Sequence, residues 1–135
     1  MLLSIDEIQA RINDLGSRIN IPSRDLHIFP VPQGDGTPYI SFDNDEYNYV
    51  YSERGVELLR RKTQSLDELL YWIMYDFIHT IAINYELAHR DPCKDGRRII
   101  FPKIIELMNK IEPAWGSRVE KRLGEILIEN PYRDD

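Results

Sequence analysis

The chain has 135 residues and a formal net charge of −6, with 42% hydrophobic and 30% charged residues. These values fit one globular domain, residues 1–135, and argue against disordered, collagen-like and membrane proteins. The negative charge argues against a general nucleic-acid binder, which needs a basic surface. It suits a protein with a basic partner, and equally a protein that is charged only for solubility.

The cysteine content and the apolar segments bear on the compartment. Cys93 is the only cysteine, which excludes an internal disulfide and a cysteine-based zinc cluster and favours a reducing environment. The first ten residues lack the basic and apolar regions of a signal peptide. Polar and charged side chains interrupt the most apolar stretch, residues 66–87, so it predicts a buried helix and no membrane span. We therefore expect a cytoplasmic protein.

The first element is predicted to be a helix. Ser4 and Glu7 have the spacing of a capping box, in which each side chain bonds the backbone of the other. Apolar residues then recur at helical spacing as far as Ile19. Gly16 weakens or ends the helix, and Pro22 stops it.

Residues 26–63 have the pattern of an antiparallel meander. Residues 39–42 and 47–52 alternate and are rich in aromatic and β-branched residues. Residues 26–29 form a short β-like run before them, and residues 56–62 follow them. Asp43-Asn44-Asp45 and Arg54-Gly55 supply the turns between the last three runs. The region therefore predicts three or four strands.

The remainder predicts three helices. Ser65 and Glu68 form a second capping box at the start of a helix over residues 65–89, whose apolar residues point in nearly every direction. A further helix carries residues 100–111, with Pro102 in its first turn or at a kink, and Pro113 suits the first turn of the last helix. The expected fold class is α+β: an N-terminal helix, a meander of three or four strands, and three helices packed on it.

Asp76 interrupts the apolar surface of the long helix. Thr80 and Asn84 follow it at i+4 and i+8, and His79 lies one turn after it. An unpaired buried carboxylate is costly, so Asp76 must find a donor, become protonated or line a cavity. Asp76, His79, Thr80 and Asn84 are therefore a candidate polar pocket. The same pattern also fits a buried network that only ties the helix to the sheet.

The pattern of histidines argues against a metal centre. Asp76 and His79, and likewise Glu86 and His89, place a carboxylate and an imidazole one turn apart. A di-iron site needs such pairs on two helices, whereas both of these pairs lie on one. The sequence also has no Gly-rich phosphate loop, nucleophile elbow or metalloprotease motif. We therefore expect no metal, no cofactor and no catalytic residue.

Tyrosines alternate along one predicted strand. Tyr47, Tyr49 and Tyr51 share one face of it. Three carboxylates are close to them in the sequence: Asp43, Asp45 and Glu46. A tyrosine-rich surface with an acidic rim suits a protein interface, so these six residues are candidate partner contacts. The alternative is that the tyrosines pack under the long helix.

Several segments carry a family resemblance. They are Tyr49-Val-Tyr-Ser-Glu-Arg-Gly-Val-Glu57, the stretch from Arg60 to Ile73, Tyr85-Glu-Leu-Ala-His-Arg90, Gly96-Arg-Arg98, Pro113-Ala-Trp115 and Glu129-Asn-Pro-Tyr132. Together they resemble the immunity protein 63 family of bacterial polymorphic toxin systems, over residues 47–132. The most specific part is the Ser-Glu-Arg-Gly turn followed by Asp-Glu-Leu-Leu-Tyr-Trp-Ile.

The resemblance implies a bacterial cytoplasmic protein that protects its producer by binding and sterically blocking a cognate toxin domain. It implies a protein partner, no nucleic acid and no membrane, and it transfers no catalytic or toxin-contact residue to this sequence. The alternative function is a small enzyme, or a small-molecule or peptide sensor, that uses the polar site on the 65–89 helix. The sequence leaves the toxin's identity and the oligomeric state open.

Overall fold

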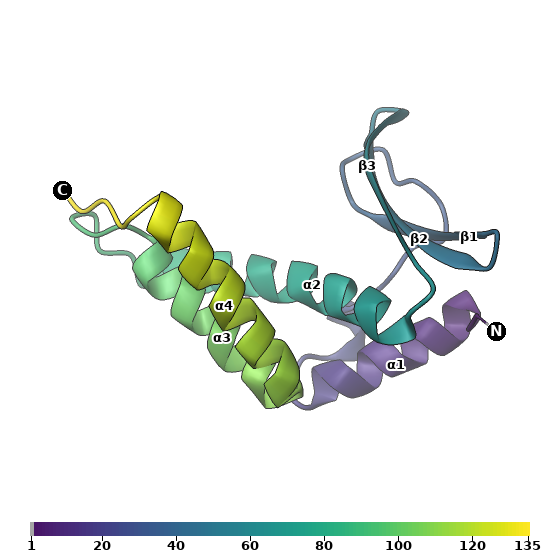
Figure 1. Cartoon of the computed structure of the whole chain (residues 1–135), viewed down its shortest axis with the longest axis horizontal. Coiled ribbons are helices and arrows are strands. Elements are labelled where there is room, and N and C mark those ends of the chain that lie inside the picture. Colours follow the sequence, from purple (N-terminus) through teal and green to yellow (C-terminus); the bar gives the residue numbers. More distant parts are fainter. Residues whose placement is uncertain (1) are drawn as a thin grey trace. The chain divides into compact units, whose positions relative to one another are not determined.

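The computed structural model describes residues 2–135, and their fold is α+β (Figure 1). The chain divides into two units, the first ending at Ile73 and the second beginning at Met74. The first unit holds an N-terminal helix, a three-stranded antiparallel sheet and the start of a long helix. The second holds the rest of the long helix and two further helices. The order of elements is the predicted one.

Helix α1 (Ile5–Ser17) begins at the predicted capping box. The Ser4 hydroxyl accepts from the Glu7 amide at 3.2 Å, and the Glu7 carboxylate accepts from the Ser4 amide at 3.0 Å. Gly16 does not end the helix but lies in its last turn, where an added Cβ would collide with the Leu26 side chain. The glycine therefore allows close packing of α1 on the following segment, which includes the short 3₁₀ helix η1 (Ser23–Asp25).

The sheet has the strand order β1-β2-β3, with both pairs antiparallel. The strands are β1 (Tyr39–Asp43), β2 (Glu46–Glu53) and β3 (Val56–Thr63). Two-residue turns join them, and both central residues of each turn have positive φ: Asn44 and Asp45, then Arg54 and Gly55. This is the backbone of type I′ turns, whose twist matches that of the flanking strands.

The fourth predicted strand is not formed. Residues 26–29 contribute one ladder-like bond, from the Ile40 amide to the Phe29 carbonyl at 2.9 Å. The Gln9 side chain of α1 instead bonds the Leu26 carbonyl at 2.8 Å and the Ile28 amide at 2.9 Å. Side-chain bonds to the helix thus replace the ladder in this segment, and the meander has three strands.

The β2–β3 pair contains a register shift. Tyr51 lies opposite Leu59, but Ser52 lies opposite Glu57, so Leu58 is an extra residue on β3. Such a β-bulge bends the strand that carries it.

Helix α2 (Leu66–Ala88) runs through the boundary between the two units. The Ser65 hydroxyl accepts from the Glu68 amide at 3.2 Å, as the second capping box predicts. Leu69 and Ile73 are buried before the boundary, and Ile78 and Ala82 after it. None of the helices within residues 2–135 combines the length and the apolar content that a bilayer crossing requires.

Helices α3 (Arg97–Ile111) and α4 (Pro113–Glu129) pack along each other in the second unit (Figure 1). Pro102 lies inside α3 and not in its first turn, so the Arg98 carbonyl loses its helical donor. Pro113 occupies the first turn of α4, as predicted. The buried hydrophobic residues of the pair are Ile104, Leu107, Met108, Ile111, Trp115, Val119 and Leu123.

Candidate functional site

The three candidate tyrosines share one face of β2 but differ in burial. Tyr47 and Tyr49 are 2% and 3% exposed, whereas Tyr51 is half-buried. The Tyr47 hydroxyl accepts from the Leu3 amide at 2.8 Å, and the Tyr49 and Tyr51 rings meet edge to face at 5.3 Å. Tyr47 and Tyr49 therefore belong to the core of the first unit, and Tyr51 is the member that a partner can reach.

The three candidate carboxylates lie at the other end of β2 from Tyr51. Asp43 and Asp45 are exposed and Glu46 is half-buried, all at the β1–β2 turn. The Asp43 carboxylate accepts a hydrogen bond from the side-chain nitrogen Nδ2 of Asn48 at 3.1 Å. The structure thus gathers the acidic residues but does not place them beside the accessible tyrosine.

Apolar side chains at the β2–β3 hairpin form an exposed surface that the sequence did not single out. Val56, Leu58 and Leu59 are 60%, 61% and 51% exposed, and Leu59 lies directly opposite Tyr51. We call Tyr51, Val56, Leu58 and Leu59 the hairpin patch. Its acidic neighbours are Glu53 and Glu57 on the strands themselves and Asp35, which bridges to Glu53. The sequence signal that could have revealed this patch is the group of apolar residues directly after the Arg54-Gly55 turn.

The candidate polar pocket forms an exposed stripe on α2. His79, Thr80 and Asn84 are exposed, and Asp76 is half-buried where the sequence predicts a largely buried side chain. The Thr80 hydroxyl donates to the Asp76 main-chain carbonyl at 3.2 Å, and the His79 ring stacks on Tyr75 at 6.0 Å. Asp76 borders the exposed side of the helix, which explains its partial burial. The stripe therefore does not supply an enclosed site.

A cavity of about 330 Å³ lies in the second unit, where α2 ends and α3 begins. It is lined by Glu86, Arg90, Asp91, Pro92, Lys94, Asp95, Gly96 and Ile99. Glu86 is 3% exposed, and its carboxylate accepts hydrogen bonds from the Arg90 guanidinium, the shortest at 2.7 Å. These hydrogen bonds hold the pKa of Glu86 below its ordinary value.

His89 takes no part in a metal-like arrangement. Its ring Nδ1 bonds the Tyr85 carbonyl at 2.8 Å, and the ring stacks on Tyr85 at 4.1 Å. Throughout residues 2–135, no three histidine, cysteine, aspartate or glutamate side chains come together as metal ligands would.

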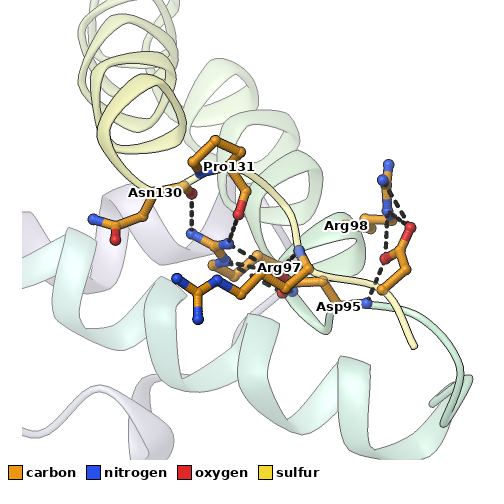
Figure 2. A network of polar contacts seen from close by, with 7 residues as sticks. Asp95, Arg97, Arg98, Asn130 and Pro131 are labelled. Atoms are coloured by element: carbon orange, nitrogen blue, oxygen red, sulfur yellow. Dashed lines mark hydrogen bonds and ion pairs between the residues drawn. The ribbon is translucent and has the colours of Figure 1, made fainter.

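A network of polar contacts fastens the end of the chain to the start of α3 (Figure 2). Asp95 accepts a bond from the Arg97 guanidinium at 2.8 Å and another from the Arg133 amide at 2.9 Å. Arg97 in turn donates to the carbonyls of Asn130 at 2.8 Å and Pro131 at 2.9 Å. We call residues 93–98 and 130–135 together the C-terminal clasp.

Asp134 is the second acceptor of the clasp. It accepts from the Asp95 amide at 2.8 Å and from the Arg98 guanidinium at 2.9 Å. The Arg98 guanidinium also lies 4.3 Å from the centre of the Tyr132 ring. Bonds from Arg97 lower the pKa of Asp95 far below its ordinary value, and those from Arg98 lower the pKa of Asp134.

These pKa shifts predict acid sensitivity in the clasp. A carboxylate whose pKa is lower in the folded than in the unfolded state stabilises the fold above its unfolded pKa, and this contribution is lost as the pH falls through the folded pKa. For Asp95 the loss begins near its ordinary value of 3.8. Urea denaturation between about pH 7 and about pH 3 should therefore show a steeper loss of stability in the parent than in Asp95→Asn. Parallel pH profiles would contradict this role of Asp95.

Similarity to known proteins decides the family. The model of the family described as Immunity protein 63 matches residues 43–125, more than half of the 135 residues. The chain belongs to the Immunity protein 63 family. No curated protein and no solved structure matches it.

The Immunity protein 63 match covers part of each unit of the chain. It includes all of β2, β3, α2 and α3, and therefore the hairpin patch, the polar stripe and the cavity. The tail of the C-terminal clasp, residues 130–135, follows the matched range. Membership implies the role of an immunity protein.

Proposed function

We propose that this member of the Immunity protein 63 family neutralises a cognate bacterial toxin by binding its toxin domain and blocking it sterically. The observation that carries the proposal is the family match over residues 43–125. Because the match runs across both units, we infer that residues 1–135 act as one immunity domain. The protein acts in the cytoplasm of the producing bacterium, where its toxin would otherwise do harm.

The hairpin patch supplies the anchor area of the proposed interface. Tyr51 is half-buried beside the exposed Leu59, so its ring is held in place before binding and loses little freedom on contact. Aromatic side chains in such settings carry a large share of binding energy. Tyr47 and Tyr49 support this surface from the core and do not touch the partner.

The carboxylates at the β1–β2 turn supply long-range attraction. Asp43 and Asp45 are exposed in a protein of net charge −6, so they add to a field that accelerates encounter with a basic toxin surface. Inhibition by occlusion needs neither a catalytic residue nor a cofactor on this chain, and both proteins should leave the complex with unchanged masses.

Co-expression and binding kinetics test the proposal, with the toxin domain encoded beside this gene as the probe. Co-expression should restore growth. Tyr51→Ala should weaken binding by about 2 kcal/mol, mainly through faster dissociation. Reversing Asp45 and Glu46 to lysine should slow association and reduce its dependence on salt.

An exposed tyrosine outside the proposed surface serves as the control. Tyr85 is 40% exposed on α2, so Tyr85→Ala removes a comparable ring and should leave the kinetics unchanged. If the parent neither binds the toxin nor protects cells, the proposed function is refuted. If every variant binds like the parent while folded, the interface lies on another surface.

A further inference from the structure

Strand β3 is an open edge of the sheet. Among the described residues it pairs with β2 on one side and with no strand on the other. The outer side of β1 is different, because the Phe29 carbonyl accepts from the Ile40 amide there. An open edge presents unpaired N–H and C=O groups, on which another extended chain can add a strand.

The hydrogen-bond register shows which groups of β3 point outward. The Gly36 amide donates to the Ser52 carbonyl on the β1 side of β2. Backbone groups alternate in direction along a strand, so those of Tyr51 point toward β3 and meet Leu59. By the same alternation, the amide and carbonyl of Arg60 and of every second residue after it point away from β2.

The first half of β3 is only partly protected as an edge strand. Natural edges are shielded by charged side chains, prolines, β-bulges or a covering segment, and this half has one charged side chain, Glu57, and the bulge at Leu58. Here Val56, Leu58 and Leu59 are each more than half exposed, and the extra residue of the bulge is itself the apolar Leu58. An added strand would cover these side chains together with the open backbone groups.

The positive charge of the second half of β3 determines which kind of strand can pair with this edge. β3 carries one carboxylate, Glu57, which is ion-paired with Arg60 at 2.8 Å. Two further cations, Arg61 and Lys62, give the strand a net charge of +2 in a chain of −6. Antiparallel pairing of two copies centred on Arg60 or Arg61 would set like charges opposite each other, which destabilises a ladder. A foreign strand with carboxylates opposite these cations meets no such penalty.

We propose that β3 is the docking edge for an extended segment of the cognate toxin, which joins the sheet as a fourth strand. The inference rests on the proposed function and adds how the partner is recognised. The segment places acidic side chains opposite Arg61 and Lys62 and apolar side chains opposite Val56, Leu58 and Leu59. The backbone ladder provides affinity, and the division of β3 into apolar and cationic halves fixes the register.

Three variants test the docking edge against the inactivated toxin domain encoded beside this gene. Leu58→Lys places a charge in the apolar half, and Lys62→Pro removes an outward-pointing amide that β2 does not use. Each should raise Kd by about tenfold or more. The control Ile128→Lys changes an 81% exposed apolar residue on α4 and should leave Kd within about twofold.

Hydrogen exchange gives a readout that does not depend on the variants. The Arg60 and Lys62 amides of the parent should exchange quickly in the free protein and at least about tenfold more slowly in the complex. Unchanged exchange at both amides, or tight binding by folded Leu58→Lys and Lys62→Pro, overturns the docking edge while toxin neutralisation stands. A parent that does not bind the toxin overturns both. If the parent forms a dimer and Lys62→Pro dissociates it, the edge of β3 binds a second copy of this chain, and the inference is also overturned.

Discussion

Replacing Tyr47 with alanine should destabilise the fold by about 3–5 kcal/mol, the range for removing a large buried aromatic ring. Tyr47 is 2% exposed in the first unit, and its hydroxyl accepts from the Leu3 amide. The variant loses the packing of the ring, leaves a cavity and leaves the Leu3 amide without this acceptor. Because small domains have a total stability of about 5–15 kcal/mol, a substantial fraction of the variant should be unfolded at elevated temperature.

Two substitutions separate this effect from binding. Tyr47→Phe keeps the ring and removes the hydroxyl, and should cost about 1–2 kcal/mol. Tyr51→Ala, on the same face of β2 but half-buried, should cost less stability than Tyr47→Ala and more toxin affinity. Urea denaturation and binding of the three variants check both effects. If Tyr47→Ala unfolds like the parent, Tyr47 is not the core residue that its burial indicates.

Two glycines of α4 should respond in opposite ways to alanine. A Cβ at Gly116 would collide with the Asn109 side chain of α3 and lie 2.8 Å from its Cα, so the two helices would have to move apart. Overpacking of this kind costs about 1–3 kcal/mol. A Cβ at Gly124 meets nothing within 4 Å, so Gly124→Ala should instead stabilise the helix by about 0.5–1 kcal/mol.

Thermal unfolding of the two variants measures this difference. For a chain of 135 residues, about 1 kcal/mol corresponds to a shift in Tm of a few degrees, so the two substitutions should move Tm in opposite directions. Because Gly124→Ala lies on the same helix, it controls for helix propensity. A stabilised Gly116→Ala would mean that α3 and α4 are not as close at this point as the structure places them.

The features that local sequence determines were predictable. Ser4 and Ser65 cap their helices through residues three positions away, so the capping boxes could be recognised without tertiary information. The two turns of the meander are equally local, because Asn44 and Gly55 tolerate the positive φ that a two-residue hairpin needs. These signals gave the element order and most of the boundaries.

The features that depend on distant contacts were not predictable. Alternation showed that Tyr47 and Tyr51 share a face, but not that Tyr47 is buried with its hydroxyl bonded by the Leu3 amide while Tyr51 is half-buried. Residues 26–29 have strand composition, yet Gln9 of α1 takes their backbone bonds. In the clasp, Arg97 bonds Asn130 and Pro131, which lie 33 and 34 positions further along the chain, and no local pattern predicts such contacts.

The clasp also affects how residues 130–135 meet endopeptidases. A protease cleaves an extended, detached segment, but here Arg133 and Asp134 are bonded to Asp95 and the Asp135 amide donates to the Cys93 carbonyl at 3.0 Å. Cleavage within residues 130–135 must therefore wait until this segment and the loop before α3 open together as one local unfolding event. Because carboxylates take part in the bonds to arginines and backbone amides, acid would detach the segment and expose it to digestion.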